Sequence, residues 1–194
     1  MGLEKSEYSV LIVSAAEKFN TVMSELLSES GYVNVKFESS ISSAQRAYAE
    51  RPYDFVIINS PLPDDVGTRF AIDLCVSGSN VALVVVRSEI FEEVFEKVSK
   101  HGVFAMPKPM SKPSVEMALR WMACSRERLR KNEKKTLSIE EKMEEIRTVN
   151  RAKWLLISEL KMDEPGAHRY IEKQAMDRCV TRRQVAEDII KTYS

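Results

Sequence analysis

Six basic side chains near the C-terminal end are the residues best suited to chemistry, because their charges can pair with phosphate groups. They are Lys153, Arg169, Lys173, Arg178, Arg182 and Arg183. The chain of 194 residues has no net charge. However, residues 1–111 carry 10 basic and 15 acidic residues, whereas residues 112–194 carry 19 and 14. An acidic first part and a basic second part predict that a polyanion binds the second part. The alternative is an ordinary charged and solvated helix surface.

Other chemically active residues are sparse. The three cysteines, Cys75, Cys124 and Cys179, lie far apart and lack the spacing of metal ligands. The two histidines, His101 and His168, are too few for a metal site or a catalytic triad. We therefore expect reduced thiols, no metal, no cofactor and no catalytic residue, so an enzyme is not expected.

Three apolar patterns at helical spacing predict three short helices between Val149 and Ile190. The sets are Ala152, Leu155, Leu156 and Leu160; then Ala167, Tyr170, Ile171 and Ala175; then Val185, Ala186, Ile189 and Ile190. Asp163 can cap the second helix, and Thr181 with Gln184 forms a capping-box pattern for the third. Each helix is too short to be stable alone, so we expect the three to pack on one another.

The order of residues in this stretch resembles the ANTAR domain, the RNA-binding module of transcription antitermination regulators of the AmiR and NasT type. The residues that carry the resemblance are Ala152-Lys153, Ala167, Ile171, Ala175-Met176, Val185-Ala186, Ile189 and Ile190. The resemblance implies a dimer that binds hairpins in nascent leader RNA, so that the terminator hairpin does not form. We expect the six basic residues named above to contact the RNA, because of their charge and location.

The first part of the chain alternates short β-prone runs with helical stretches. The expected strands are residues 8–13, 33–38, 53–59, 81–86 and 103–106, with helices that extend to about 30 and over about 41–50, 67–76 and 89–100. This alternation predicts a parallel sheet covered on both faces, in the flavodoxin-like doubly wound order. No Gly-rich phosphate loop follows the first strand, which argues against nucleotide binding.

Residues 6–120 resemble response-regulator receiver domains, which have the CheY-like fold. The resemblance lies in VLIV of the first strand, DFVIINSPLPDDVG around the third, and Lys108-Pro109 after the fifth. A receiver phosphorylates an aspartate with the help of magnesium held by an acidic pair. Here Asn59 stands at the phosphoacceptor position, and Ser14 and Ala15 stand at the acidic-pair positions. Of the receiver's site residues, only the lysine is retained, as Lys108. We predict a pseudo-receiver that is not phosphorylated.

Three other acidic residues lie near this site in the sequence. Asp54 opens the third strand, and we expect it at the surface. Asp64 and Asp65 are adjacent in a loop, and we expect them to cap a helix rather than to hold a metal.

A long helical stretch begins near Pro113, and its apolar residues can be arranged in heptads. One seam position contains Val115, Met122, Leu129, Thr136, Met143 and Asn150, and the other Ala118, Ser125, Asn132, Ile139, Ile146 and Lys153. The pattern favours a parallel coiled-coil dimer over a lone solvated helix. A break near Ser138, which can cap a second helix, stays open as an alternative. We expect Trp121 and Trp154 to pack in a core.

We therefore predict a pseudo-receiver over residues 1–111, a coiled-coil linker over 112–148 and an ANTAR domain over 149–194. The expected function is that of a dimeric RNA-binding antitermination regulator, with a sensor protein as a possible partner of the pseudo-receiver. The alternatives are a DNA-binding response regulator and a coiled-coil protein-interaction module. Because the sequence has neither a signal peptide nor an apolar run of membrane-spanning length, we expect a cytoplasmic location without a membrane partner.

Overall fold

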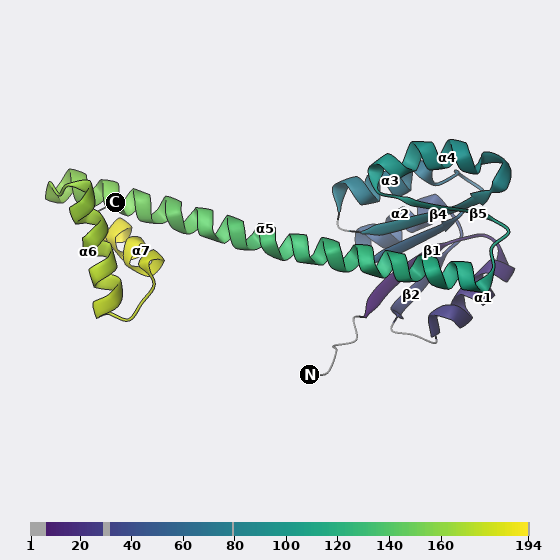
Figure 1. Ribbon diagram of the computed structural model, residues 1–194, viewed down its shortest axis with the longest axis horizontal. Helices are drawn as coiled ribbons and strands as arrows, with labels where there is room; N and C mark the ends of the chain where they lie inside the picture. The colour runs from purple at the N-terminus through teal and green to yellow at the C-terminus, as the bar shows by residue number, and fades with distance from the viewer. Residues whose placement is uncertain (1–6, 29–31, 79, 194) are drawn as a thin grey trace. The chain divides into compact units, whose positions relative to one another are not determined.

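The computed structural model describes residues 7–28, 32–78 and 80–193 (Figure 1). The chain divides into two compact units, one up to Arg130 and one from Lys131 onward. The boundary falls inside a single long helix, α5, which runs from Lys112 to Leu160. Each unit has its own buried core, and the two are described separately below.

The first unit contains a parallel sheet of five strands. The strands are β1 (Tyr8–Val13), β2 (Tyr32–Glu38), β3 (Phe55–Asn59), β4 (Val81–Arg87) and β5 (Phe104–Lys108). Their order in the sheet is β2-β1-β3-β4-β5, and each neighbouring pair is parallel. The predicted flavodoxin-like order is therefore confirmed. Strand β3 is buried over its whole length, because helices cover both faces of the sheet.

Helices of the first unit pack on the two faces of this sheet. They are α1 (Glu17–Ser28), α2 (Ile41–Glu50), α3 (Thr68–Ser77) and α4 (Phe91–Val98), with 3₁₀ turns at Ser88–Ile90 and Ser99–His101. Side chains of α2, α3 and α4 form one core with the sheet, including Ala44, Ala71 and Val94. Side chains of α1 and of the first turns of α5 form the other, including Met23 and Met122. Figure 1 shows the two helical layers.

Helix α5 is continuous over 49 residues, which answers the question left open by the sequence. The predicted heptad seam must be corrected over its first part, because Val115, Ala118 and Met122 are buried against the sheet. These side chains complete the core of the first unit and are not available to a second helix. In contrast, Ile139 and Met143 are exposed farther along the same helix.

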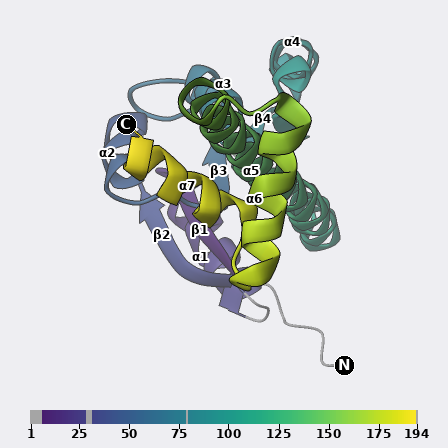
Figure 2. The same cartoon turned by 90° about the vertical axis from the view of Figure 1, so that its left-hand side faces the viewer.

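The second unit consists of the end of α5, α6 (Glu164–Asp177) and α7 (Arg182–Tyr193), seen from one end in Figure 2. Its core contains Ala152, Leu156, Ala167, Ile171, Ala175, Val185, Ala186 and Ile189, as the apolar patterns predicted. Leu160 and Tyr170 were expected in the core but are exposed. Leu160 is the last residue of α5, where the helix ends and the chain turns away.

Both predicted helix caps of the second unit are present. Asp163 Oδ1 accepts a hydrogen bond of 2.9 Å from the backbone N–H of Gly166. Thr181 Oγ1 accepts from the backbone N–H of Gln184 at 3.2 Å, and Gln184 Oε1 accepts from the backbone N–H of Thr181 at 2.9 Å. These reciprocal bonds satisfy backbone donors that the first turn leaves without helical partners.

The prediction that both tryptophans pack in a core was wrong. Trp121 is 56% exposed and Trp154 is 71% exposed. Each lies on α5 away from the apolar side of the helix, so helical spacing alone placed them on the wrong face. Of the thiols, Cys75 is half-buried, and burial raises its pKa. None of the helices in the described part of the chain has the length and apolar composition needed to span a lipid bilayer.

Candidate functional sites

The predicted phosphoacceptor position is filled by a buried amide. Asn59 ends β3, and its Nδ2 donates a hydrogen bond of 2.9 Å to Oγ of Ser14, which follows β1. Ser14 Oγ also accepts from the backbone N–H of Ala16 at 3.1 Å. Asn59 and Ser14 are both buried, and Ala15 is exposed. The three positions supply no carboxylate, so they do not fit the magnesium ion that the receiver resemblance implies.

The retained lysine lies beside this amide and is held by the backbone. Lys108 Nζ donates a hydrogen bond of 2.5 Å to the carbonyl oxygen of Ser60, the residue that follows Asn59. The carbonyl of Lys108 accepts a hydrogen bond from the hydroxyl of Ser88. Burial, with the nearby charge of Arg87, lowers the pKa of Lys108. The site therefore brings together Ser14, Asn59 and Lys108, but it has no side chain that can accept a phosphoryl group as a carboxylate does.

The adjacent acids of the β3–α3 loop hold backbone groups in place. Asp64 accepts hydrogen bonds from the backbone N–H groups of Ile41 and Ser42, at 3.0 and 2.9 Å, at the start of α2. These bonds lower the pKa of Asp64 to about 2. Asp65 Oδ1 accepts from the backbone N–H of Gly67 at 2.6 Å. The prediction that an acid of this pair caps a helix is therefore confirmed for Asp64, although the helix precedes it in the sequence.

Asp54 was predicted to be a surface residue, and this prediction was wrong. Its Oδ1 lies 2.8 Å from Nε of Arg126 and 2.9 Å from Nη2 of Arg130, both on α5. Its Oδ2 accepts hydrogen bonds of 3.0 Å from the backbone N–H and the hydroxyl of Ser9. The Asp54 side chain is only 15% exposed, because α5 passes over this end of the sheet. The sequence shows two arginines four residues apart on one helix, but it does not show which acid they meet.

Four of the six basic candidates, all in the second unit, form ion pairs with carboxylates. The pairs are Lys153 with Glu164 at 3.1 Å, Arg178 with Asp188 at 2.6 Å, Arg182 with Glu145 at 3.5 Å and Glu172 at 3.9 Å, and Arg183 with Glu187 at 2.9 Å. Arg182 thus connects α7 to both α5 and α6. The charges of these four residues are shared with carboxylates of the same unit, which reduces the field that they present to a phosphate.

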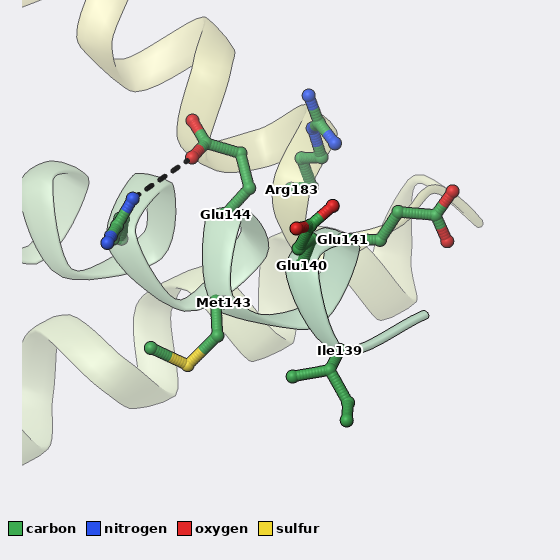
Figure 3. A pocket seen from close by; sticks show the side chains of 7 residues that line it. Ile139, Glu140, Glu141, Met143, Glu144 and Arg183 are labelled. Carbon is green, nitrogen blue, oxygen red and sulfur yellow. Dashed lines mark ion pairs between the residues drawn. The ribbon is translucent and has the colours of Figure 1, made fainter. Parts of the chain in front are cut away.

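Arg183 also borders a groove of about 490 Å³ beside α5 (Figure 3). The groove is lined by Ile139, Glu140, Glu141, Met143, Glu144, Arg147 and Arg183. The hydrogen bond with Glu187 and the charges of Glu187, Glu144 and Glu145 raise the pKa of Arg183. Three glutamates and two arginines line the groove, so its charges nearly balance and it is not a basic surface.

The remaining two basic candidates are more accessible. Arg169 and Lys173 lie on α6, and both are exposed. Neither forms an ion pair with any other residue that the structure describes; Arg169 Nε donates a long hydrogen bond of 3.4 Å to the carbonyl of Pro165. They lie one helical turn apart, on the side opposite the buried Ile171. The six predicted RNA contacts therefore differ in their surroundings. Arg169 and Lys173 are the two whose charges are not offset by an ion pair with a described residue.

Comparisons with known proteins match both units. Residues 138–190 match the family model of the ANTAR domain. Over 187 residues the chain is 29% identical to the transcriptional regulatory protein PdtaR of Mycobacterium tuberculosis strain H37Rv, covering 94% of this chain and 89% of that protein. The first unit has the fold of the signal receiver domain of an HD domain-containing protein from Pseudomonas fluorescens Pf-5, with a TM-score of 0.57 at 18% identity, covering 68% of this chain and 96% of that one. A CheY-like receiver domain from Methylobacillus flagellatus is also similar, with a TM-score of 0.51 at 23% identity, covering 60% and 99%.

Proposed function

We propose that this chain, which has an ANTAR-domain match and a receiver-fold N-terminal unit, binds hairpins in nascent leader RNA as a dimer and prevents transcription termination. The observation that carries the proposal is the ANTAR match over residues 138–190, which includes the whole core of the second unit. PdtaR, the relative that matches along nearly the whole chain, is named a transcriptional regulatory protein.

The proposed mechanism is a competition between two RNA structures. A protein that binds one hairpin and not its alternative stabilises the bound form in proportion to its concentration and affinity. If that hairpin shares nucleotides with the terminator, binding keeps the terminator from forming. Lys and Arg side chains supply most of the affinity by pairing with phosphates, and unpaired loop bases supply readable edges. We place the main phosphate contacts at Arg169 and Lys173, and weaker ones at Lys153, Arg178, Arg182 and Arg183.

The first unit acts in this proposal without phosphorylation. Its fold is that of a receiver, but the Asn59 amide and the absence of carboxylates at Ser14 and Ala15 remove the acceptor and the metal ligands. We propose that it serves as a docking domain for a sensor protein. Dimerisation is assigned to the exposed apolar residues of α5 in the second unit, including Ile139, Met143 and Ile146, because the earlier seam residues belong to the first core.

Measuring RNA affinity against salt concentration tests the proposed function. The intact protein should bind structured RNA more tightly than duplex DNA of equal length. Replacing Arg169 and Lys173 by Ala should weaken binding and reduce the magnitude of the slope of log K against log salt by about one to two. The matched pair Arg182→Ala and Arg183→Ala should reduce it less, because Glu145, Glu172 and Glu187 already offset these charges.

Two results would argue against this function. Tighter binding to duplex DNA than to hairpin RNA would favour the DNA-binding response regulator. If all variants bind RNA with the same affinity and that affinity does not depend on salt, a protein-interaction module is favoured, in which the basic residues are only part of a solvated surface. Circular dichroism of each variant should match that of the unmodified protein, since exposed substitutions usually change the stability by less than about 0.5 kcal/mol.

A further inference from the structure

Trp154 presents a large aromatic surface to solvent near the end of α5. It is 71% exposed, although it lies between Lys153 and Leu155, which are both partly buried. Burying a tryptophan is among the most favourable changes available to a side chain, so a tryptophan left in water is a candidate for contact with a partner. The chemistry of its neighbours indicates which partner.

The side of α5 that carries Trp154 is basic from Arg147 onward, and the carboxylate of Glu140 on the same side lies about four turns earlier. At 3.6 residues per turn, the positions within about 60° of Trp154 from Met143 onward are few. They are Met143, Arg147, Asn150, Arg151, Ile157 and Ser158. Arg151 is exposed and forms no ion pair with any residue in the described ranges. Arg147 has only a long contact of 3.9 Å with Glu144.

We propose that Trp154 is a stacking platform for an unpaired base of a bound RNA, and that Arg147 and Arg151 pair with the adjacent phosphates. This inference rests on the proposed RNA-binding function and adds the kind of nucleotide that is recognised. Bases in a duplex already stack on each other, whereas loop bases have a free face. Aromatic stacking combined with basic side chains that follow the backbone is the usual arrangement for unpaired nucleotides. Trp154 would therefore make this surface selective for loops.

A second copy of α5 is a less suitable occupant of this surface. The exposed apolar seam reaches Ile146, and the next seam position, Asn150, is exposed but polar. Lys153 is 16% exposed in its side chain and pairs with Glu164, and Ile157 packs against the unit's core. Beyond Ile146 the seam therefore offers a second helix one polar and two covered side chains, so its apolar contact weakens before it reaches Trp154.

Fluorescence of the intact protein tests the stacking directly. With Trp121→Phe, Trp154 is the only tryptophan that remains in the chain. Its emission should be quenched by a pool of RNA hairpins with a fixed stem and a randomised loop, and not by the same stem as a blunt duplex. Trp154→Ala should weaken binding to the hairpin pool roughly tenfold to a hundredfold, and Trp154→Phe should weaken it less. Trp121→Ala, an equally drastic change at an exposed tryptophan, should leave the affinity unchanged.

The basic neighbours have their own matched control. Arg151→Ala should reduce the magnitude of the salt slope of hairpin binding by about one. Lys142→Ala removes an exposed charge from another side of the same helix and should not change it. If the hairpins bind Trp154→Ala as tightly as the unmodified protein and do not quench the emission of Trp154, the inference is overturned, although RNA binding remains. If the emission of Trp154 falls as the protein concentration rises in the absence of RNA, and Trp154→Ala no longer forms dimers, a second copy of this chain covers Trp154 and the inference is overturned. Failure of the unmodified protein to bind hairpins would reject the proposed function itself.

Discussion

The guanidinium of Arg126 on α5 lies against the carboxylate of Asp54 at the start of β3, with Nε 2.8 Å from Oδ1. Arg130, one helical turn later, reaches the same oxygen at 2.9 Å. Burial alone raises the pKa of Asp54, but the hydrogen bonds from Ser9 and Arg126 and the charge of Arg130 outweigh it, so that the pKa is below its usual value. One acid thus fixes two turns of α5 to the sheet.

Asp54→Ala should destabilise the first unit by about 2–4 kcal/mol, because it removes the carboxylate that accepts from Arg126, Arg130 and the N–H of Ser9. Urea unfolding followed by the fluorescence of Trp121, in a Trp154→Phe background, measures this change. Asp73→Ala, at an exposed position of α3, is the matched control and should change little. Equal unfolding midpoints for the two variants would show that the network around Asp54 does not stabilise the domain.

Acid should destabilise the first unit in a defined pH range. The pKa of Asp64 is about 2, below an unfolded value of about 3.9. A carboxylate whose pKa is lowered by folding adds stability above the unfolded pKa, and this contribution is lost as the pH falls through the folded value. Between about pH 4 and pH 2 the unfolding free energy should therefore fall, and Asp64→Asn should make this fall shallower. An unchanged slope in Asp64→Asn would contradict the role of its bonds to α2.

Incubation with acetyl phosphate and magnesium should not phosphorylate the protein, because Asn59 cannot form an acyl phosphate. Asn59→Asp alone should also remain unmodified and should be less stable, since it places a carboxylate in a buried site without a metal. Intact mass spectrometry detects the phosphoryl group. The informative control is Asn59→Asp combined with Ser14→Asp and Ala15→Asp, which restores the acidic set. A stable phosphoryl adduct on the unmodified first unit would refute the prediction.

The proposed dimer should depend on the middle of α5. Met143→Glu places a charge in the exposed apolar seam and should shift the protein towards monomer, as measured by sedimentation equilibrium. Met117→Glu makes the same change at another exposed methionine of α5, within the first unit, and should leave the association unchanged. If Met117→Glu instead dissociates the protein, the first unit carries the interface.

The core of the second unit should not tolerate charge. Ala186 is completely buried, so Ala186→Asp should unfold the unit by burying an unpaired carboxylate, at a cost of at least about 3 kcal/mol. Circular dichroism should show the loss of helix. Met176→Asp, at an exposed position of the same unit, serves as the control for adding a carboxylate and should retain most of the helix.

The core of the second unit was predictable because it depends on local periodicity, and the order of strands because the alternation of strands and helices favours the doubly wound pattern. The buried sets led by Ala152, Ala167 and Val185 follow helical spacing, and Asp163 is an N-cap that acts within one turn. These features require only residues close together in the chain. The Asn59 substitution was visible for the same reason, since it occurs within a recognisable strand motif.

Contacts between distant segments were not predictable in this way. Asp54 and Arg126 are 72 positions apart, and no local pattern connects them. Trp154 was predicted to be buried because helical periodicity does not show which side of α5 other helices cover. The heptads had a similar defect: the first positions, such as Val115 and Met122, have the spacing of a coiled coil but pack on a sheet instead. Helical spacing identifies an apolar face but not the surface that covers it.

Helix α5 belongs to two cores, and between them it contributes to neither. Up to Leu129 one side of the helix packs in the first unit, and from Val149 one side packs in the second. The intervening turns, including Lys134, Lys135 and Lys142, are exposed. A protease that cleaves after lysine therefore meets its substrate sites in a helix that no core protects, and a cut there leaves each core with all of its own helical residues. Cleavage requires the helix to unwind locally, and a second molecule packed along these turns would slow it further.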